Sequence, residues 1–431
     1  MLPGSRVISQ PEFRDQTGSF LELIGSQEGP IGYQELVASR AEAPDPSLAG
    51  VPEAVKVRTD LLLPLPGRPL RVRLYREVTE TPRPLLLWLH GGGFVGGTLE
   101  DVDVACTGLA RRAHLNVISL EYRLAPEHSF PAALHDTYDT LSWLREHGAA
   151  LGGDGQILAG GQSSGANLVA ATCLRTRDLG APQVARQVLC YPPLDFSGDS
   201  EAHRRFDGVL LTRSGMDWYQ QQYLAGQAIT PYAAPLTAPS LAGLPPALIL
   251  GAGLDPLRDD ARRYAQRLLD EGVQATYLEY DQTPHAFLNF PGALSAAWQA
   301  IQDIADHLTT FYGPGTSSAA ISPDHGRRGW PTGPPCWNGT WWPSAPTTGS
   351  PTRRCCARAT WRGPPCGARW LAARPSCRAG GDASPATWAC RSTQRATTWD
   401  WSTPSTGSAV IRPASPSSAP TGPSPPTRAS A

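Results

Sequence analysis

A serine between two glycines is the residue of this sequence best suited to chemistry. Residues 161–165 read Gly-Gln-Ser-Ser-Gly, so Ser163 lies two positions from Gly161 and two from Gly165. An apolar run at residues 157–160 precedes this segment, and a helical pattern begins near Gly165. A serine on such a sharp strand-to-helix turn is typical of a nucleophile, and flanking glycines allow the close backbone approach that the turn requires. Because the pattern is short enough to occur by chance, its context decides the interpretation.

A second glycine-rich segment could stabilise the negative charge that develops when this serine attacks. Residues 90–93 read His-Gly-Gly-Gly and directly follow an apolar run at residues 84–89. Backbone N–H groups in this segment, with that of Ser164, would point at the oxygen that becomes negative when an ester carbonyl is attacked. Any Cβ atom there would obstruct the substrate or the backbone angle. The alternative interpretation is a flexible glycine loop without a partner.

An acid and a base that could activate Ser163 follow later in the chain. A serine hydroxyl is a poor nucleophile near neutral pH unless a base, most often a histidine, accepts its proton during the attack. Asp255 follows an apolar run at residues 247–251, and His285 follows one at residues 275–280, so both are expected in loops at strand ends. The chain order serine, aspartate, histidine is the order found in α/β-hydrolases.

Apolar runs and helical patterns alternate along the chain and would position these residues. Residues 55–63 and 70–75 predict two strands joined by a turn at residues 66–67. Runs typical of buried parallel strands cover residues 84–89, 116–121, 157–160, 188–191, 247–251 and 275–280. Helical periodicity covers residues 101–113, 131–146, 165–177, 258–271 and 294–311. Eight strands with intervening helices predict an α/β fold, a mostly parallel sheet with helices on both faces, opened by an antiparallel hairpin.

Two segments do not follow this alternation. They are residues 1–50 and residues 196–240, the second of which lies between the sixth and seventh predicted strands. Open α/β sheets bind their ligands at the carboxyl ends of the strands. We therefore expect both segments to cover that edge of the sheet as a lid over the site. His203 lies in the second segment, which makes it a candidate ligand contact.

Four motifs in this order resemble those of the hormone-sensitive-lipase-like esterases, also called bacterial family IV esterases. The motifs are residues 90–94 (His-Gly-Gly-Gly-Phe), 122–127 (Tyr-Arg-Leu-Ala-Pro-Glu), 255–259 (Asp-Pro-Leu-Arg-Asp) and 285–287 (His-Ala-Phe). The resemblance covers residues 55–312. It implies an α/β-hydrolase fold for a catalytic domain at residues 51–312, and hydrolysis of small carboxylic esters with short or medium acyl chains.

The resemblance also implies a role for each motif residue. The nucleophile, acid and base of the family correspond to Ser163, Asp255 and His285. Its oxyanion donors correspond to the backbone N–H groups of Gly92, Gly93 and Ser164. Residues that support the two glycine motifs are His90, Gly91, Gly161 and Gly165. The resemblance implies no cofactor and no metal ion. Because members of the family are often dimers, it is consistent with a homodimer.

Two motifs depart from the family pattern. The family usually has Gly-Asp-Ser-Ala-Gly around the nucleophile, whereas this chain has Gln162 and Ser164 at the variable positions. The neutral Gln162 leaves no negative charge beside the serine at this position. The pH dependence of activity in relatives is therefore not expected to hold for this chain. Ser164 still offers its backbone N–H. Ala286 stands where the family has glycine, which we expect to shift the His285 loop slightly.

Two other functions use the same residues or the same fold. An amidase, a lactonase or a deacetylase would need the same nucleophile and base, because esters and amides pass through the same kind of tetrahedral intermediate. A ligand-binding protein on a decayed hydrolase fold, as in the plant hormone receptors that resemble this family, would lack one of the three residues. All three are present here, which favours an enzyme.

The last part of the chain, residues 313–431, differs in composition from the rest. It has 13 Arg and three acidic residues, a net charge of +10, whereas residues 1–312 have a net charge of −11. Four of its residues are Leu, Ile, Val or Phe, too few to offset the chain entropy of folding. It contains nine of the 13 Trp and six of the nine Cys, a composition that resembles GC-rich DNA translated in the wrong frame. We interpret this segment as a disordered or frameshift-derived tail.

A metal site built from the cysteines of this tail is a rival interpretation. No pair of these cysteines has the CxxC spacing of a zinc knuckle.

Cysteine use and hydropathy indicate a cytoplasmic protein. Cys106, Cys173 and Cys190 show no disulfide framework, which suits a reducing compartment. Residues 1–30 lack the apolar core of a signal peptide, and no stretch is long enough to span a bilayer. The acidic charge of residues 1–312 argues against nucleic acid as a partner.

Overall fold

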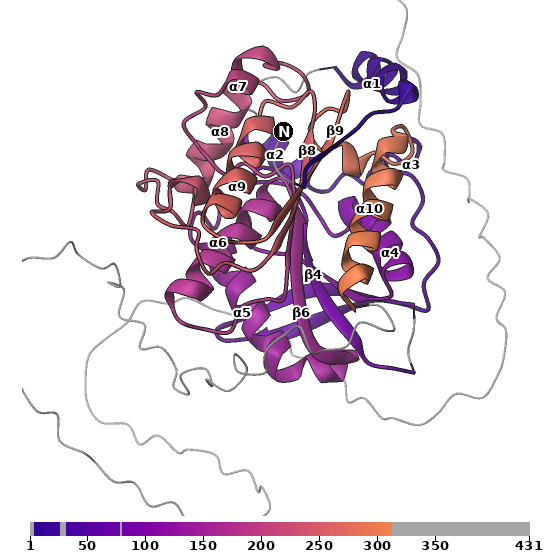
Figure 1. Cartoon of the computed structure of the whole chain (residues 1–431), viewed down its shortest axis with the longest axis vertical. Helices are drawn as coiled ribbons and strands as arrows, with labels where there is room; N and C mark the ends of the chain where they lie inside the picture. Colours follow the sequence, from indigo (N-terminus) through magenta and orange to yellow (C-terminus); the bar gives the residue numbers. More distant parts are fainter. Residues whose placement is uncertain (1–3, 26–31, 78–79, 313–431) are drawn as a thin grey trace, which may run out of the picture. The chain divides into compact units, whose positions relative to one another are not determined.

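A sheet with helices on both faces forms the centre of the described part of the chain (Figure 1). The computed structural model describes residues 4–25, 32–77 and 80–312, which contain a nine-stranded sheet. The strands are β1 (Arg6–Ile8), β2 (Val57–Leu65), β3 (Arg68–Arg76), β4 (Arg83–Leu89), β5 (Asn116–Leu120), β6 (Gly153–Gln162), β7 (Gln187–Cys190), β8 (Ala247–Ala252) and β9 (Ala275–Tyr280). The α-helices are α1 (Pro11–Ile24), α2 (Tyr33–Ser39), α3 (Pro46–Ala49), α4 (Asp103–Arg112), α5 (Ala132–His147), α6 (Ser164–Asp178), α7 (Glu201–Arg205), α8 (Arg213–Leu224), α9 (Arg258–Asp270) and α10 (Ser295–Tyr312).

The strand order is β1-β9-β8-β7-β6-β4-β5-β3-β2, and the pairs from β1 to β5 in this order are parallel. β3 pairs antiparallel with both β2 and β5, so the predicted hairpin opens the sheet. The predicted mostly parallel α/β fold is therefore confirmed. Strands covered on both faces consist of continuous apolar runs, and β4 is buried from Pro84 to Leu89.

The sheet has one strand more than the eight predicted from the sequence. β1 pairs in parallel with β9, with Arg6 opposite Leu278 and Ile8 opposite Tyr280. Three residues that are exposed or half-buried are too few to show an alternating pattern, so the sequence contains no strand signal there. Residues 1–50 therefore extend the sheet as well as contribute helices.

Two apolar layers pack against the two faces of the sheet. One layer lies between the sheet and helices α5, α6 and α9, with Leu168 and Tyr264 fully buried. The other lies between the sheet and helices α4 and α10, where Phe13 and Phe20 of α1 also pack. Figure 1 shows these two groups of helices on opposite sides of the strands. Burial of the sheet on both faces fixes the strand ends that carry the site residues.

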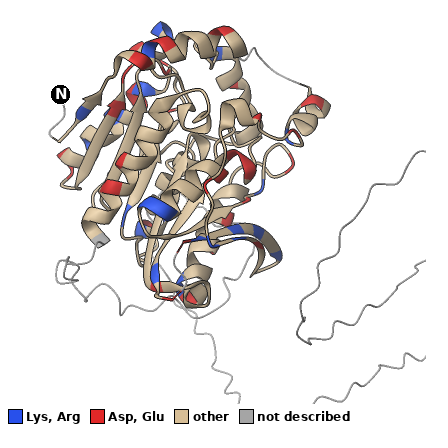
Figure 2. Cartoon of the chain, turned by 90° about the vertical axis from the view of Figure 1, so that its right-hand side faces the viewer, with Lys and Arg blue, Asp and Glu red and all other residues tan. Residues whose placement is uncertain are grey.

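The β2–β3 hairpin carries several charged residues, among them Arg58, Asp60 and Arg73. Figure 2 shows the charged residues of the described chain in blue and red. On the hairpin, the nearly buried Arg73 donates from Nε to Asp60 Oδ1 at 2.5 Å. Its Nη1 lies 3.1 Å from Asp103 Oδ2 of α4, and Arg58 also binds Asp103. Because buried charges must be paired to be tolerated, these contacts hold the hairpin against α4.

Loops that follow four parallel strands meet at one edge of the sheet. β4 is followed by residues 90–93, β6 by Ser163, β8 by Asp255 and β9 by His285. β4 lies beside β6, and β8 lies beside β9, with β7 between the two pairs. Because the carboxyl ends of parallel strands lie at the same edge, these residues are brought together there.

Within the described part of the chain, no helix is long and apolar enough to cross a membrane. The predicted disordered or frameshift-derived tail, residues 313–431, and the metal site weighed for its cysteines lie outside the described residues. Cys106, Cys173 and Cys190 are buried and free.

Candidate active site

Ser163 occupies a strained backbone position between β6 and α6, with φ 50° and ψ −120°. A positive φ is unusual for a residue with a Cβ atom, and in this strand-to-helix turn it exposes the serine Oγ. The flanking glycines make the turn possible. A Cβ atom on Gly161 would lie 2.7 Å from the carbonyl carbon of Gly165, and one on Gly165 would lie 2.4 Å from the carbonyl oxygen of His90.

Ser163, His285 and Asp255 form a continuous line of hydrogen bonds. His285 Nε2 lies 2.9 Å from Ser163 Oγ, and His285 Nδ1 lies 2.7 Å from Asp255 Oδ2. Asp255 is fully buried, and its Oδ1 accepts the backbone N–H of Leu257 at 2.8 Å. An ionised carboxylate only accepts hydrogen bonds, so it places the imidazole proton on Nδ1 and leaves Nε2 free to accept the serine proton.

The second carboxylate of the 255–259 motif faces away from His285. Asp259 Oδ2 accepts the backbone N–H of Ala202 at 2.9 Å, and Asp259 Oδ1 accepts from Arg258 Nε at 3.2 Å. These contacts fix the start of α7 and lower the pKa of Asp259 against the effect of its partial burial. Of the two carboxylates, Asp255 is thus the one placed to orient the base.

The glycine loop lies against Ser163 with free backbone donors. A Cβ atom on Gly91 would lie 3.3 Å from the Cβ of Ser163, which shows how closely the loop approaches. Gly92 and Gly93 have φ values of 114° and 60°, and within the described residues their N–H groups donate no hydrogen bond. Ser164 is the first residue of α6, where N–H groups have no partner within the helix. All three N–H groups are therefore available to an oxyanion.

His90 supports this loop from beneath. Its ring stacks on Tyr122 with centroids 4.3 Å apart, and its Nδ1 lies 2.7 Å from the carbonyl oxygen of Gly91. Burial lowers the pKa of His90, so its neutral ring donates from Nδ1 to that carbonyl. The Tyr122 hydroxyl in turn donates to the carbonyl oxygen of His90 at 2.9 Å. These contacts fix the backbone from which the loop donors project.

Comparison with known proteins gives the same fold. Residues 86–289 match the sequence family described as "alpha/beta hydrolase fold". The chain is 37% identical over 291 residues to carboxylic ester hydrolase LipN of Mycobacterium tuberculosis, an alignment that covers 64% of this chain and 77% of LipN. The chain belongs to the α/β-hydrolase family.

Other members support the same subgroup. The α/β-hydrolase is 36% identical over 250 residues to ethyl acetate hydrolase of Pseudomonas putida, covering 56% of this chain and 79% of the relative. The solved structure of a hyperthermophilic esterase from Pyrobaculum calidifontis matches with a TM-score of 0.62 and 33% identity, over 70% of this chain and 98% of that one. The predicted resemblance to the hormone-sensitive-lipase-like esterases is confirmed.

The two departures from the family pattern have structural explanations in this α/β-hydrolase. Gln162 is buried beneath the nucleophile, and its Oε1 accepts the hydroxyl of Tyr191 at 3.2 Å. Ala286 has φ 58°, a left-handed conformation that favours glycine. Ala286 thus adopts a backbone conformation that glycine adopts more easily, and His285 still reaches Ser163. The slight shift of the His285 loop stays a prediction.

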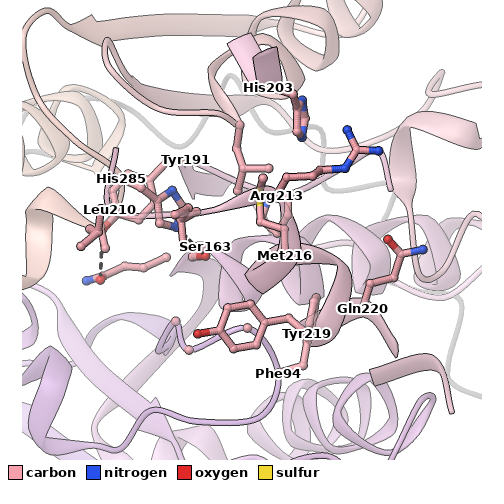
Figure 3. Close-up of a pocket in the computed structure, with 18 of the residues that line it drawn as sticks. Phe94, Ser163, Tyr191, His203, Leu210, Arg213, Met216, Tyr219, Gln220 and His285 are labelled. Carbon is pink, nitrogen blue, oxygen red and sulfur yellow. Dashed lines mark hydrogen bonds between the residues drawn. The ribbon is translucent and has the colours of Figure 1, made fainter. Parts of the chain in front are cut away.

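A cavity of about 350 Å³ opens onto Ser163 and His285 (Figure 3). Apolar side chains form most of its wall, as in most small-molecule sites. Residues 196–240 contribute one side of this wall, and Ile24 of α1 contributes to another. His203, predicted as a candidate ligand contact, lines the cavity together with the three predicted residues Gly91, Gly92 and Gly93.

Two of the aromatic cavity residues that sequence reasoning missed contact the site directly. Tyr191 follows β7 and packs against the ring of His285 with centroids 5.0 Å apart. Its place directly after a buried parallel strand is a signal that could have identified it. Tyr219 of α8 lies over Gly93, and a Cβ atom on Gly93 would meet its ring at 2.7 Å. No motif marks Tyr219, since its contact depends on how α8 folds back over the loop.

Replacing Gly93 by alanine should reduce ester turnover by about a hundredfold, the effect of removing one oxyanion donor. The new Cβ meets the Tyr219 ring at 2.7 Å in a left-handed conformation, so the loop must move. Gly96→Ala is the matched control, because its Cβ would be no closer than 3.6 Å to any neighbour. Steady-state kinetics of both variants test this, and equal losses would show that Gly93 has no special role.

Proposed function

We propose that this protein is a carboxylic ester hydrolase that forms an acyl-enzyme on Ser163. The observation that supports this most strongly is the line of contacts from Asp255 through His285 to Ser163, at 2.7 Å and 2.9 Å, which ends in an apolar cavity. Relatives named carboxylic ester hydrolase, esterase and ethyl acetate hydrolase support the same substrate class. Its substrate is therefore a small-molecule ester.

In the acylation step, Ser163 Oγ bonds to the ester carbonyl carbon while His285 Nε2 accepts the hydroxyl proton. The carbonyl oxygen becomes negative and accepts hydrogen bonds from the N–H groups of Gly92, Gly93 and Ser164. The buried carboxylate of Asp255 stabilises the imidazolium. His285 then gives the proton to the alcohol oxygen, the bond from carbon to that oxygen breaks, and the alcohol leaves.

In the deacylation step, water takes the place of the alcohol. His285 Nε2 accepts a proton from the water as its oxygen attacks the acyl carbon, and the same loop donors bind the oxyanion. The bond to Ser163 Oγ breaks, His285 returns the proton to the serine, and the carboxylic acid is released. Each residue is then in its starting state.

The size of the cavity supports short or medium acyl chains. Its volume of about 350 Å³ lies at the small end of small-molecule sites, which range over roughly 300–1,000 Å³. Phe94, Leu210 and Met216 line it, so the acyl chain meets an apolar wall. A long chain would have to leave the cavity and expose its apolar surface to water.

Our proposal includes a lid formed by residues 1–50 and 196–240. Leu36 of α2 packs with Val95 and Ala125 against the rings of Trp218 and Tyr219 on α8. The side chain of Arg40 donates to the carbonyl oxygens of Val95 at 2.6 Å and Ala125 at 2.7 Å, and it pairs with Glu127. The two segments therefore meet above the glycine loop, where they would exclude water from the developing charge. We assign the selection of substrates to these two segments.

A series of p-nitrophenyl esters and matched p-nitroanilides tests this function. We expect kcat/KM to be highest for short or medium acyl chains, to fall for long ones, and to be far lower for the anilides. Anilide hydrolysis at rates near those of the esters would make the protein an amidase instead. Absence of hydrolysis throughout, in a folded protein, would favour a ligand-binding role.

A further inference from the structure

The proposed mechanism leaves the polar end of the cavity without a role. His203 of α7 and Arg213 of α8 both line the cavity that contains Ser163 and His285. Figure 3 shows the Arg213 guanidinium beside the His203 ring, and its charge acts on the pKa of that ring. Both residues belong to the 196–240 segment, and neither makes a hydrogen bond to Ser163, His285 or Asp255.

His203 is almost completely buried, yet one of its ring nitrogens has no partner. Its relative exposure is 6%, and its Nδ1 lies 2.7 Å from Ser200 Oγ. Ser200 Oγ also accepts the backbone N–H of His203 at 3.2 Å, and its own proton can be donated to Nδ1. Our proposal uses this arrangement, in which the ring proton lies on Nε2. Within the described residues Nε2 makes no hydrogen bond. Burial and the nearby Arg213 lower the pKa of His203, which keeps the ring neutral.

Arg213 is held in place with one nitrogen left free. Its Nη1 donates to the carbonyl oxygen of Gly198 at 2.6 Å, and its Nε lies 3.4 Å from Asp217 Oδ1. A Cβ atom on Gly198 would lie 2.7 Å from the guanidinium carbon, so the guanidinium rests directly on that residue. Among the described residues no group accepts from Nη2. Asp195, the other carboxylate on this wall, is paired with Arg263 at 2.7 Å.

We propose that His203 Nε2 and Arg213 Nη2 together bind an oxygen acceptor that the substrate carries in addition to its scissile ester. The His203 ring is almost completely buried and the Arg213 side chain is 45% exposed, and both border the cavity. A substrate oxygen placed between them would accept a hydrogen bond from each. This inference rests on the proposed function and narrows it. The preferred substrates are esters whose acid or alcohol part carries a second carbonyl or carboxylate, rather than plain alkyl esters.

Matched substrates on the full chain test this inference. On the acyl side they are ethyl hexanoate, ethyl 5-oxohexanoate and monoethyl glutarate, and on the alcohol side butyl acetate and 3-oxobutyl acetate. Titration of the released acid gives kcat/KM for each. We expect one carbonyl-bearing or carboxylate-bearing ester to exceed its alkyl reference by about tenfold, the effect of one net hydrogen bond. The keto and carboxylate substrates show which acceptor is bound, and the two sides show which part of the ester carries it.

Variants then locate the site. His203→Leu and Arg213→Met should remove most of the preference, measured as the ratio of oxygen-bearing to alkyl ester within each variant. His203→Gln keeps a donor and should retain part of it, including where His203→Leu does not fold. Arg205→Met is the matched control and should keep the full ratio, because Arg205 lies on the same helix α7, is exposed and does not line the cavity.

The possible outcomes separate the two proposals. Equal hydrolysis of alkyl and oxygen-bearing esters by the natural chain overturns this inference and leaves the proposed function intact. A preference that survives in both His203→Leu and Arg213→Met overturns the assigned residues. Absence of hydrolysis of every ester in a folded protein counts against the proposed function itself.

Discussion

Replacing Ser163 by alanine should lower ester turnover by about a million-fold, as loss of the nucleophile does in subtilisin. The Ser163 hydroxyl is the group that His285 Nε2 contacts at 2.9 Å, and alanine offers nothing to acylate. The residual rate comes from the loop donors and substrate binding alone. Steady-state kinetics with a short-chain p-nitrophenyl ester measures the effect.

The Ser163→Ala variant should remain folded, because the change removes one oxygen atom and no packing contact. Ser142→Ala is the matched control: this serine lies on α5 and its Oγ donates to the carbonyl oxygen of Tyr138 at 3.0 Å, away from the cavity. Its turnover should stay close to that of the natural chain. A folded Ser163→Ala protein with activity within about tenfold of the natural chain would exclude Ser163 as the nucleophile.

Replacing Asp255 by asparagine should lower turnover roughly 10⁴-fold, as in the matching change of chymotrypsin-type enzymes. The structure explains which way the new amide would face. Asp255 Oδ1 accepts the N–H of Leu257 at 2.8 Å, so the amide oxygen would keep that position and the NH₂ group would face His285 Nδ1. The ring proton would then move to Nε2, which could no longer accept the serine proton. Turnover and circular dichroism of the variant measure activity and folding separately.

Asp259→Asn is the control for this experiment. Asp259 accepts from Ala202 and Arg258 rather than from His285, so its loss should loosen the start of α7 and change turnover little. A severe loss in Asp259→Asn together with a nearly silent Asp255→Asn would assign the acid to Asp259. That result would contradict the geometry of the line from Asp255 to Ser163.

Much of the fold could be predicted because its strands are buried on both faces. β9 has the predicted bounds, and β8 differs by one residue, since each is an apolar run between turn residues. β6 begins at Gly153 rather than at residue 157, because its first residues pair with β4 at Arg83 and have no apolar pattern of their own. Backbone pairing without side-chain burial leaves no periodic signal.

The site residues that lie at strand ends could be predicted from the sequence. Ser163, Asp255 and His285 lie in the loops that follow predicted strands, so their convergence follows from a parallel sheet. Tyr219, which contacts Gly93, and Arg40, which binds the carbonyl oxygen of Val95, could not be predicted, because each comes from a segment whose path depends on long-range packing. The left-handed backbone of Ala286 has no signal in the residue itself, since alanine seldom adopts it, and the family glycine at this position is the feature that indicates it.

Mass spectrometry of the covalent intermediate tests the central claim most directly. The natural chain and Ser163→Ala would be treated with a fluorophosphonate, which phosphonylates activated serines, then digested and analysed peptide by peptide. We predict one adduct on Ser163, formed in proportion to the loss of ester turnover, and no adduct in Ser163→Ala. An adduct on another residue that accounts for the loss of turnover, or full loss without modification of Ser163, would contradict the acyl-enzyme mechanism proposed for this α/β-hydrolase.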